Sequence, residues 1–387
     1  MGFIARITDW LETRWIAPAY SGWVLGGLAL CFFGAAINTM VGWLYVLSGV
    51  SFALLGMNAL LTRRSLLGLE VRRHTIQPVS AGDQLTIELE IANQTNQPKT
   101  LLQVQDLISF VLGQPVQAAV ETILPHDTYR TVYYQPTQRR GVYRWQTVQL
   151  RTATPLGLFW CRRYWDVPAT AIVYPTVLPL TACPLIDQIG QENSAQFYSQ
   201  NRSFQTATEG LTRSLRPYRQ GDATRLIHWR TSARYGELRV RELEVITEGR
   251  EVVICLDSAG NWQQDDFEQA VIAAASLYFY ALGQQLNVKL WLSGTGSVQG
   301  SRVVLEALAA TQSGEDSIAS APPNCPLIWL SQNPLSLSSL PPSSQWVLWP
   351  TVSSLQSEIL VNRDRPGLVI QSNQPLQLQL QKNPAFR

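Results

Sequence analysis

The chain has 387 residues, enough for two or three domains at roughly 100–200 residues each. Its formal net charge of +2 indicates no particular class of partner, and only three of its 30 basic residues are lysines. This arginine bias fits fixed ion pairs or contacts with carboxylates and phosphates, and it equally fits a habit of the lineage. Five cysteines without a C-x-x-C spacing argue against a disulfide framework or a zinc site and fit a reducing compartment.

The N-terminal part of the chain contains a long uncharged stretch. No Asp, Glu, Lys or Arg occurs between Trp15 and Arg63. One membrane span takes about 20 residues, so this stretch is long enough for two. It predicts a hairpin of transmembrane helices at Tyr20–Ile37 and Val41–Leu61, with the turn at Asn38-Thr39. A cleavable signal peptide would be a shorter apolar run, and a soluble core would rarely extend this far without a charge.

Charged, small and aromatic residues support the hairpin. Arg6 and Arg14 precede it and Arg63 and Arg64 follow it, so the positive-inside tendency predicts that both termini are cytoplasmic. We therefore expect residues 1–65 to anchor a multi-pass protein in the inner (plasma) membrane, with the lipid bilayer as a partner and the soluble domains in the cytoplasm. Small residues predict close helix packing, and aromatic residues predict interface anchoring: Gly22, Gly26; Trp15, Tyr20, Trp43, Tyr45.

Residues 66–180 have the periodicity of β-strands. Apolar and polar residues alternate strictly over Gln84–Ile91, and turn-forming residues follow it. Several short strands at this spacing predict an antiparallel sandwich of immunoglobulin-like build. Further alternating runs occur at Thr131–Tyr134, Tyr143–Leu150 and Ala171–Tyr174.

Residues 181–250 include an arginine-rich segment. Between Gly210 and Arg250 there are nine arginines and five acids. Gly221-Asp222 predicts a turn whose carboxylate caps a helical turn or pairs with Arg225, and Tyr235-Gly236 predicts a second turn before a strand at Leu238–Val245. Ile227 and Trp229 are expected to be packing residues, and His228 a hydrogen-bonded structural residue.

Three roles for this arginine-rich segment stay open from the sequence. Interspersed opposite charges usually form ion pairs within a protein, so internal clasps between the segment and its flanking domains come first. A surface that docks a protein partner comes second. Phosphate or nucleic-acid binding comes last, because acids interleave the arginines and no recognised nucleic-acid motif is present; we expect no nucleic acid as a partner.

Residues 251–387 alternate between strand and helix patterns. Glu251–Asp257 is an apolar run that ends in an acid, as a buried parallel strand does. A helix follows from Asp265 to about Gln285, with Phe267, Val271 and Leu282 among its core positions. The pattern predicts an α/β domain with an open, mostly parallel sheet and helices on both faces. Further elements are expected at Asn287–Leu292, Ser301–Thr311, Pro326–Leu330, Gln345–Leu348 and Val369-Ile370.

The carboxyl ends of parallel strands are the usual ligand sites of such sheets. In this chain they single out Asp257, Ser258 and the loop Gly294–Gly300. The glycines of that loop miss the dinucleotide-binding spacing by one residue, so we expect a loop and no cofactor site.

Residues 216–242 match the pattern R-x-Y-x-x-G-D-x-x-R-x-I-x-W-x-x-S-A-R-x-G-x-L-x-V-x-E, and Arg140-Gly141 and Pro155–Phe159 form two further short motifs. Through this pattern, with support from the two short motifs, the chain resembles bacterial membrane proteins of domain of unknown function family 58. We call the matching residues the signature: Arg216, Tyr218, Gly221, Asp222, Arg225, Ile227, Trp229, Ser232, Ala233, Arg234, Gly236, Leu238, Val240 and Glu242.

The resemblance implies a C-terminal domain similar to von Willebrand factor type A domains and a link to MoxR-type AAA+ ATPases. Such domains often hold a divalent ion through D-x-S-x-S. The corresponding residues here are Asp257, Ser258, Ala259 and Asn261, and Ala259 supplies no oxygen, so this motif is degenerate. We expect no metal site.

A catalytic site is not evident in the sequence. His74, His126 and His228 are isolated from one another, and no P-loop, H-E-x-x-H or G-x-S-x-G occurs. We therefore expect a membrane-anchored, non-catalytic adaptor or scaffold that engages a MoxR-type AAA+ ATPase, client proteins, or both, in complex assembly or maturation; an oligomer is compatible with this role. The alternative is a phosphate-binding regulator or hydrolase that uses Asp257 and the Gly294–Gly300 loop.

Overall fold

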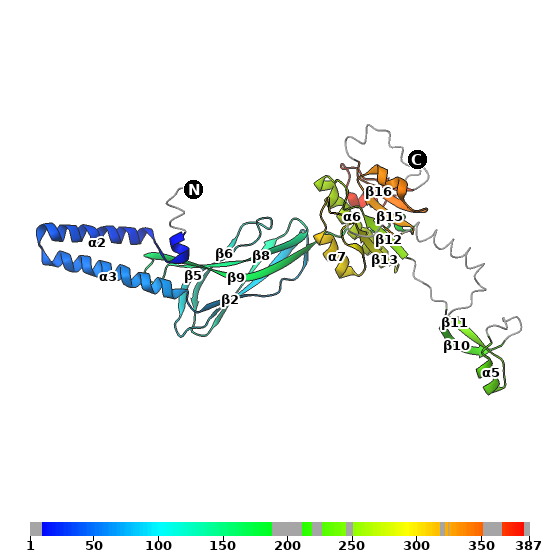
Figure 1. The fold of residues 1–387 in the computed structure, drawn as a ribbon, viewed down its shortest axis with the longest axis horizontal. Helices are drawn as coiled ribbons and strands as arrows, with labels where there is room; N and C mark the ends of the chain where they lie inside the picture. The colour runs from blue at the N-terminus through cyan, green and yellow to red at the C-terminus, as the bar shows by residue number, and fades with distance from the viewer. Residues whose placement is uncertain are drawn as a thin grey trace. The chain divides into compact units, whose positions relative to one another are not determined.

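The structure, a computed structural model, describes residues 10–187, 211–218, 227–244, 251–317, 322–323, 325–350 and 366–382. The chain divides into two units, Met1–Thr176 and Val177–Arg387. The first contains two apolar helices and a body of antiparallel strands; the second contains a parallel sheet with helices (Figure 1).

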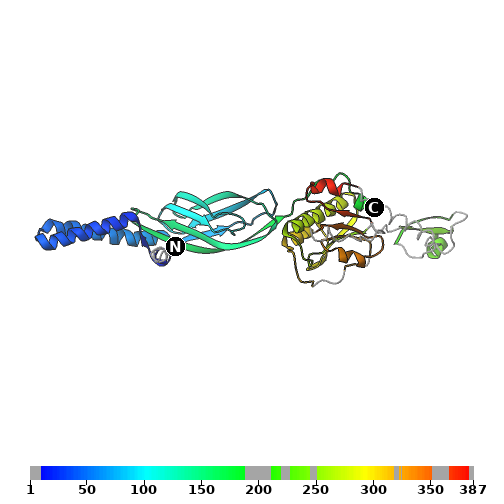
Figure 2. The ribbon, with the colours of Figure 1, turned by 90° about the horizontal axis from the view of Figure 1, so that it is seen from above.

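Helices α2 (Tyr20–Thr39) and α3 (Gly42–Ser65) pack side by side, as Figures 1 and 2 both show. Each is long and apolar enough to cross a membrane. The predicted turn at Asn38-Thr39 is wrong, because α2 continues through Thr39 and ends at Met40, which has the left-handed φ of 52°. Most of their large apolar side chains are exposed, including Trp23 (66%) and Val46 (64%).

The strands of the first unit form two mainly antiparallel sheets. One sheet has the order β2-β4-β7, and the other has the order β1-β9-β8-β5-β6, with β3 paired in parallel to β9. The strands are β1 (Ala17–Pro18), β2 (Leu69–Arg73), β3 (Val79–Ser80), β4 (Gln84–Asn93), β5 (Lys99–Asp106), β6 (Val116–Ile123), β7 (Thr128–Pro136), β8 (Gly141–Thr152) and β9 (Phe159–Tyr174).

Apolar residues from both sheets meet in one sandwich interior. Leu85, Ile87, Leu89 and Ile91 alternate along β4 and are at most 1% exposed. Leu89 and Ile91 pack with residues of β5 and β8, and Leu85 and Ile87 pack with Tyr143 and Trp145 of β8 and their neighbours. The period of two predicted from Gln84–Ile91 is thus confirmed, since every second side chain of a strand faces the opposite sheet.

A buried charge lies inside this sandwich. Arg73 of β2 and Asp106 of β5 form an ion pair of 2.8 Å, and their side chains are 2% and 1% exposed. Tyr133 of β7 donates a hydrogen bond of 2.6 Å to the same carboxylate, and Trp145 of β8 donates one of 3.1 Å. Arg73 also donates to the Val167 carbonyl of β9. Burial and the neighbouring carboxylate raise the pKa of Tyr133, which therefore stays a donor. One carboxylate thus connects strands of both sheets.

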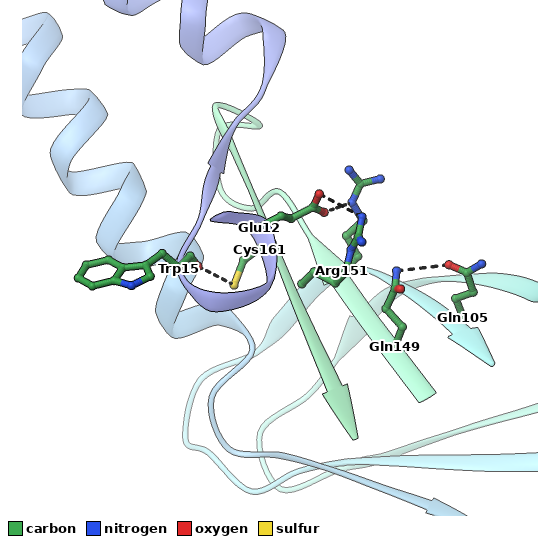
Figure 3. Close-up of polar contacts among 7 residues, drawn as sticks. Glu12, Trp15, Gln105, Gln149, Arg151 and Cys161 are labelled. Atoms are coloured by element: carbon green, nitrogen blue, oxygen red, sulfur yellow. Dashed lines mark hydrogen bonds and ion pairs between the residues drawn. The ribbon is translucent and has the colours of Figure 1, made fainter. Parts of the chain in front are cut away.

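The residues before α2 also pack on the sandwich. Glu12 is 5% exposed and pairs with Arg151 of β8 and with Arg162 of β9, the latter at 3.1 Å (Figure 3). Cys161 Sγ donates to the Trp15 carbonyl at 3.7 Å, and β1 pairs with the start of β9. These contacts determine where α2 begins relative to the sandwich.

The second unit contains a sheet of six strands in the order β14-β13-β12-β15-β16-β17. All pairs are parallel except β13 with β14, so the predicted mostly parallel sheet is confirmed. The elements are β12 (Glu251–Leu256), α6 (Gln264–Gly283), β13 (Asn287–Leu292), β14 (Gly296–Val298), α7 (Ser301–Ala310), β15 (Leu327–Ser331), the 3-10 helix η2 (Pro334–Ser339), β16 (Gln345–Leu348), β17 (Gly367–Val369) and α8 (Leu376–Leu380).

The two faces of this sheet are covered differently. On one face, α6, α7 and α8 pack on the sheet, with Phe267, Val271 and Tyr278 at most 2% exposed. Leu282 is 42% exposed, so its predicted core position is wrong; it lies in the last turn of α6. On the other face, Trp291, Trp329 and other residues pack with Leu337 and Leu340 from η2 and its C-cap. We expected helices on both faces; in the described part of the chain the helix that packs on this second face is the short 3-10 helix η2.

The buried carboxylate predicts a strong difference between two adjacent arginines. Arg73→Met leaves Asp106 charged and unpaired in the sandwich interior, which costs about 3–5 kcal/mol. Arg72→Met is the matched control, because the Arg72–Glu70 pair is 69% and 44% exposed and contributes at most about 1 kcal/mol. Hydrogen exchange of peptides from β5 and β8 in the full chain measures both. Equal protection in the two variants would show that the buried pair does not stabilise the sandwich.

Candidate functional site

The arginine-rich segment folds into a small hairpin with a helix in it. Strand β10 (Leu211–Pro217) pairs antiparallel with β11 (Arg239–Glu244), and α5 (Trp229–Tyr235) precedes β11. The predicted strand at Leu238–Val245 is confirmed within one residue at each end. Tyr218 N donates to the Leu238 carbonyl at 2.8 Å and extends the pairing.

Polar side chains hold α5 against β11. His228 is the N-cap residue of α5: its Nδ1 accepts a hydrogen bond of 3.2 Å from Thr231 N. Ser232, 6% exposed, donates to the His228 carbonyl at 3.0 Å and accepts from Arg239 N at 2.9 Å. Gly236 ends the helix with a φ of 72°, a conformation that glycine adopts without strain. The predicted turn at Tyr235-Gly236 and the structural role of His228 are both confirmed.

Much of the remaining surface of α5 is exposed and carries aromatic and basic side chains. Trp229 is 65% exposed and Tyr235 is 60% exposed. Arg230 and Arg234 are exposed as well, and among the described residues neither forms an ion pair with a carboxylate. The Arg239 guanidinium lies over the Tyr235 ring at 4.6 Å. We call Trp229, Arg230, Arg234 and Tyr235 the α5 face.

The structure accounts for part of the signature. Ser232 and Gly236 shape the hairpin; Arg234 and Trp229 lie on the α5 face. The expectation that Trp229 is a packing residue is therefore wrong, whereas Ile227 is 5% exposed as expected, because it bridges to Val240 of β11. Arg216 and Glu242 lie on β10 and β11, where Arg216 pairs with Val240 and Glu242 with Ser214. Three signature residues lie outside the described residues: Gly221, Asp222 and Arg225.

The second candidate site is the carboxyl edge of the parallel sheet at Asp257. The Asp257 carboxylate accepts a hydrogen bond of 2.8 Å from Ser331 at the end of β15. The backbone carbonyl of Asp257 accepts one of 2.6 Å from the Trp262 indole. Ser258 is fully buried, and its Oγ has no hydrogen-bond partner in the described structure. Nearby, the Gln332 side chain accepts a hydrogen bond from Gln263 N, just before α6, and donates one to the carboxylate of Asp266 in the first turn of α6. Burial raises the pKa of Asp266.

The loop predicted at Gly294–Gly300 is in fact a tight β-hairpin, because β14 pairs back on β13. Glu315 connects it to the Asp257 edge: its backbone N donates to the Ser258 carbonyl at 3.3 Å, and a Cβ at Gly294 would stand 2.6 Å from Glu315 Oε2. Sequence patterns did not reveal Ser331 or Glu315 as part of this edge. Ser331 could have been predicted, since it comes directly after an apolar run, as Asp257 does. No sequence pattern indicates Glu315, because it lies in an irregular segment.

The residues present fit a divalent ion poorly. One Asp257 oxygen is engaged by Ser331, and Ala259 offers no side-chain oxygen. No group of three or more His, Cys, Asp or Glu residues with metal-binding geometry occurs in the described ranges. A hard cation needs six or more oxygen ligands, so the D-x-S-x-S chemistry of the resembled domains has no full ligand set here.

These features describe a multi-domain chain with two N-terminal apolar helices, a β-sandwich and a parallel α/β sheet, with an exposed aromatic and basic face on a small hairpin. A protein-family model described as "Protein of unknown function DUF58" matches residues 214–308. The match begins in β10 and ends in α7, so it includes the hairpin and the first part of the parallel sheet.

The curated relative found is "Uncharacterized protein YeaD" of Bacillus subtilis (strain 168), 23% identical over 202 residues. The match covers 51% of this chain, and the chain spans about half (48%) of that protein. Solved structures that match include a CARDB domain from Pyrococcus furiosus (13% identity, TM-score 0.19, 26% of this chain and 94% of that one) and the bacterial hydrophobin BslA (13% identity, TM-score 0.18, 26% and 95%). At these TM-scores the structural likenesses support no conclusion.

The ligand set at Asp257 predicts the response to metal. Millimolar Mg²⁺ or Mn²⁺ should leave the thermal unfolding of the protein almost unchanged, because Ala259 interrupts the ion motif. An ion at 100 times its dissociation constant would stabilise the protein by about 2.7 kcal/mol, which a melting experiment resolves easily. A clear stabilisation that disappears in Asp257→Ala would contradict this account of the edge.

Proposed function

We propose that this protein is a membrane-anchored, non-catalytic adaptor that engages a MoxR-type AAA+ ATPase through the α5 face. In this proposal α2 and α3 span the inner membrane, both termini and the soluble domains are cytoplasmic, and a client protein is brought to the ATPase. The C-terminal sheet acts as a scaffold similar to a von Willebrand factor type A domain without its metal.

The observation that supports a docking role most is the composition of the α5 face. Tryptophan, tyrosine and arginine are the residues most enriched among the energetic hot spots of protein interfaces. Trp229 and Tyr235 are 65% and 60% exposed, next to two arginines that have no carboxylate partner among the described residues. Internal clasps would show the opposite pattern, with each guanidinium paired within the chain. The partner chemistry that fits is an acidic surface with an apolar pocket.

The membrane location is supported by the exposure of α2 and α3. A core helix of a soluble protein is mostly buried, whereas these two helices expose side chains such as Leu30 (62%), Val46 (64%) and Leu60 (63%). Hydrocarbon surroundings make such exposure favourable. Arg63 and Arg64 lie in the last turn of α3, and their position supports a cytoplasmic side at that end of the helices.

The alternative function, a phosphate-binding regulator or hydrolase at Asp257, has less support. An enzyme needs several polar groups that converge on one concave site. Among the described residues, the Asp257 carboxylate accepts a hydrogen bond from Ser331, and the glycine loop expected beside it is closed into the β13–β14 hairpin. The unpartnered Ser258 hydroxyl is the feature that would favour it, but it is fully buried.

The adaptor proposal predicts how charge reversal affects ATPase capture. Arg230→Glu with Arg234→Glu should weaken capture of a purified MoxR-type ATPase by the detergent-solubilised protein about tenfold or more, because about 1.4 kcal/mol corresponds to a factor of ten. Trp229→Ala should have a similar effect. The matched control is Arg144→Glu, which reverses an exposed arginine on β8 of the sandwich and should leave capture unchanged.

Melting curves of the same variants separate docking from internal clasps. A docking face predicts unchanged stability with weaker capture. Lower stability with unchanged capture would identify the arginines as clasps, and unchanged capture with unchanged stability would remove the α5 face from the proposal.

A further inference from the structure

The turn between β8 and β9, residues 154–158, is bonded to the ends of both apolar helices. From α3, Thr62 donates a hydrogen bond of 2.7 Å to the Thr154 carbonyl, and Ser65 shares one of 2.9 Å with the Thr154 hydroxyl. Asn58, 1% exposed, accepts one of 3.4 Å from Leu156 N. The polar side chains in this part of α3 are thus directed at the turn.

Helix α2 contacts the same turn from its first residues. Ser21 Oγ donates to the Gly157 carbonyl at 2.7 Å, and Ala19 N donates to the Leu158 carbonyl at 2.8 Å. A Cβ at Gly22 would overlap that Leu158 oxygen, so only glycine permits this approach. The two glycines of the G-x-x-x-G, which was predicted to bring the two helices together, have different neighbours. Gly26 faces Leu55 of α3, whereas Gly22 packs against the backbone of the turn.

Several backbone groups of the turn are consequently hydrogen-bonded within the protein. Gly157 N donates to the Ala153 carbonyl at 2.8 Å, and Thr154 N to Thr152 Oγ1 at 3.3 Å. With the helix donors above, the carbonyls of Thr154, Gly157 and Leu158 each accept a hydrogen bond within the protein. Irregular backbone at membrane depth needs internal hydrogen-bond partners of this kind.

The tip of the turn is apolar and exposed. Pro155 is exposed, and Leu156 is 57% exposed. A second leucine accompanies it: the Leu101 carbonyl accepts from Thr152 Oγ1 at 3.1 Å, and Leu101 is 66% exposed with a φ of 51°. A solvated turn would more often carry Asn, Asp or Ser at its tip.

The depth of the turn follows from its place along α3. Asn58, which accepts from Leu156, lies five residues before Arg63, and five residues of α-helix extend about 7–8 Å. Arg63 lies over the Trp15 ring at 5.2 Å, and an arginine beside an exposed tryptophan is typical of the membrane–water interface. Leu156 therefore lies on the hydrocarbon side of that interface.

We propose that the 154–158 turn of the β-sandwich is itself inserted into the bilayer, with Pro155 and Leu156 in contact with acyl chains. The occupant of this apolar surface is lipid, because the surface continues the lipid-facing sides of α2 and α3. The proposal rests on the membrane-anchor part of the proposed function. It makes the sandwich a domain held in the interface at three points, the two helices and the turn.

Lipid-quenching of a fluorescent label tests the insertion. The full chain carries Cys31→Ala and Cys325→Ser, which leaves only the three buried native cysteines. In this background Leu156→Cys is labelled with bimane, and the protein is reconstituted in phosphatidylglycerol/phosphatidylcholine vesicles. Phe110→Cys, 95% exposed on the loop after β5, is the matched control, and Leu101→Cys is a second test position. A separate chain that keeps native Cys31, exposed on α2, and carries only Cys325→Ser reports whether the helices are in lipid at all.

Insertion predicts that lipids with a doxyl group on the upper acyl chain quench the label at position 156 at least about twofold more than the label at position 110. Iodide in the water should quench only the label at 110. If Cys31 is quenched by doxyl lipid and position 156 responds to iodide like position 110, the turn is not inserted and the anchor stands. If Cys31 is also insensitive to doxyl lipid, the membrane anchor itself is wrong.

Should Leu156→Cys fail to elute with the parent protein in gel filtration, Leu101→Cys decides in its place. Doxyl quenching above the Phe110 control at that position supports the inserted surface, and iodide quenching equal to that control contradicts it.

Discussion

Hydrogen bonds from helix side chains to the backbone of one turn hold the junction between the apolar helices and the sandwich together, because backbone polar groups need partners. Ser21, Thr62 and Ser65 all direct their hydroxyls at the turn that starts at Thr154. Because the helices supply donors to the turn, and the turn fills the space at Gly22, neither part is complete without the other. The residues before α2 reinforce this arrangement, since Glu12 is paired with Arg151 and Arg162 on the sandwich.

Inside the sandwich, a buried carboxylate holds the two sheets together. Asp106 binds Arg73 and accepts from Tyr133 and Trp145, so strands of both sheets depend on one charge that water does not reach. Lys99, at the other end of β5, donates to the Arg64 carbonyl at the end of α3, and its burial lowers its pKa. Strand β5 therefore carries one contact to the helices and one to the centre of the sandwich.

Sequence alone predicted the elements well where the pattern is local. The absence of charge from residue 16 to 62 indicated two helices, and the alternation over Gln84–Ile91 indicated which side chains enter the sandwich. It could not predict the junction, because Ser21 and Gly157 are 136 residues apart and Thr62 and Thr154 are 92 apart. The exposure of Trp229 was missed for a related reason: an apolar residue beside a strand suggests a core position, and only the fold shows that this side chain is 65% exposed.

A distance measurement tests the central claim that the helices and the sandwich form one rigid body. Spin labels on native Cys31 and on Phe110→Cys, in a Cys325→Ser chain, lie in α2 and on the loop after β5 at the far end from Lys99. Pulsed dipolar spectroscopy in lipid nanodiscs should give a single narrow distance distribution, because both the turn and Glu12 hold the sandwich to the helices. A broad or multi-peaked distribution would show a hinge at the junction and contradict the account.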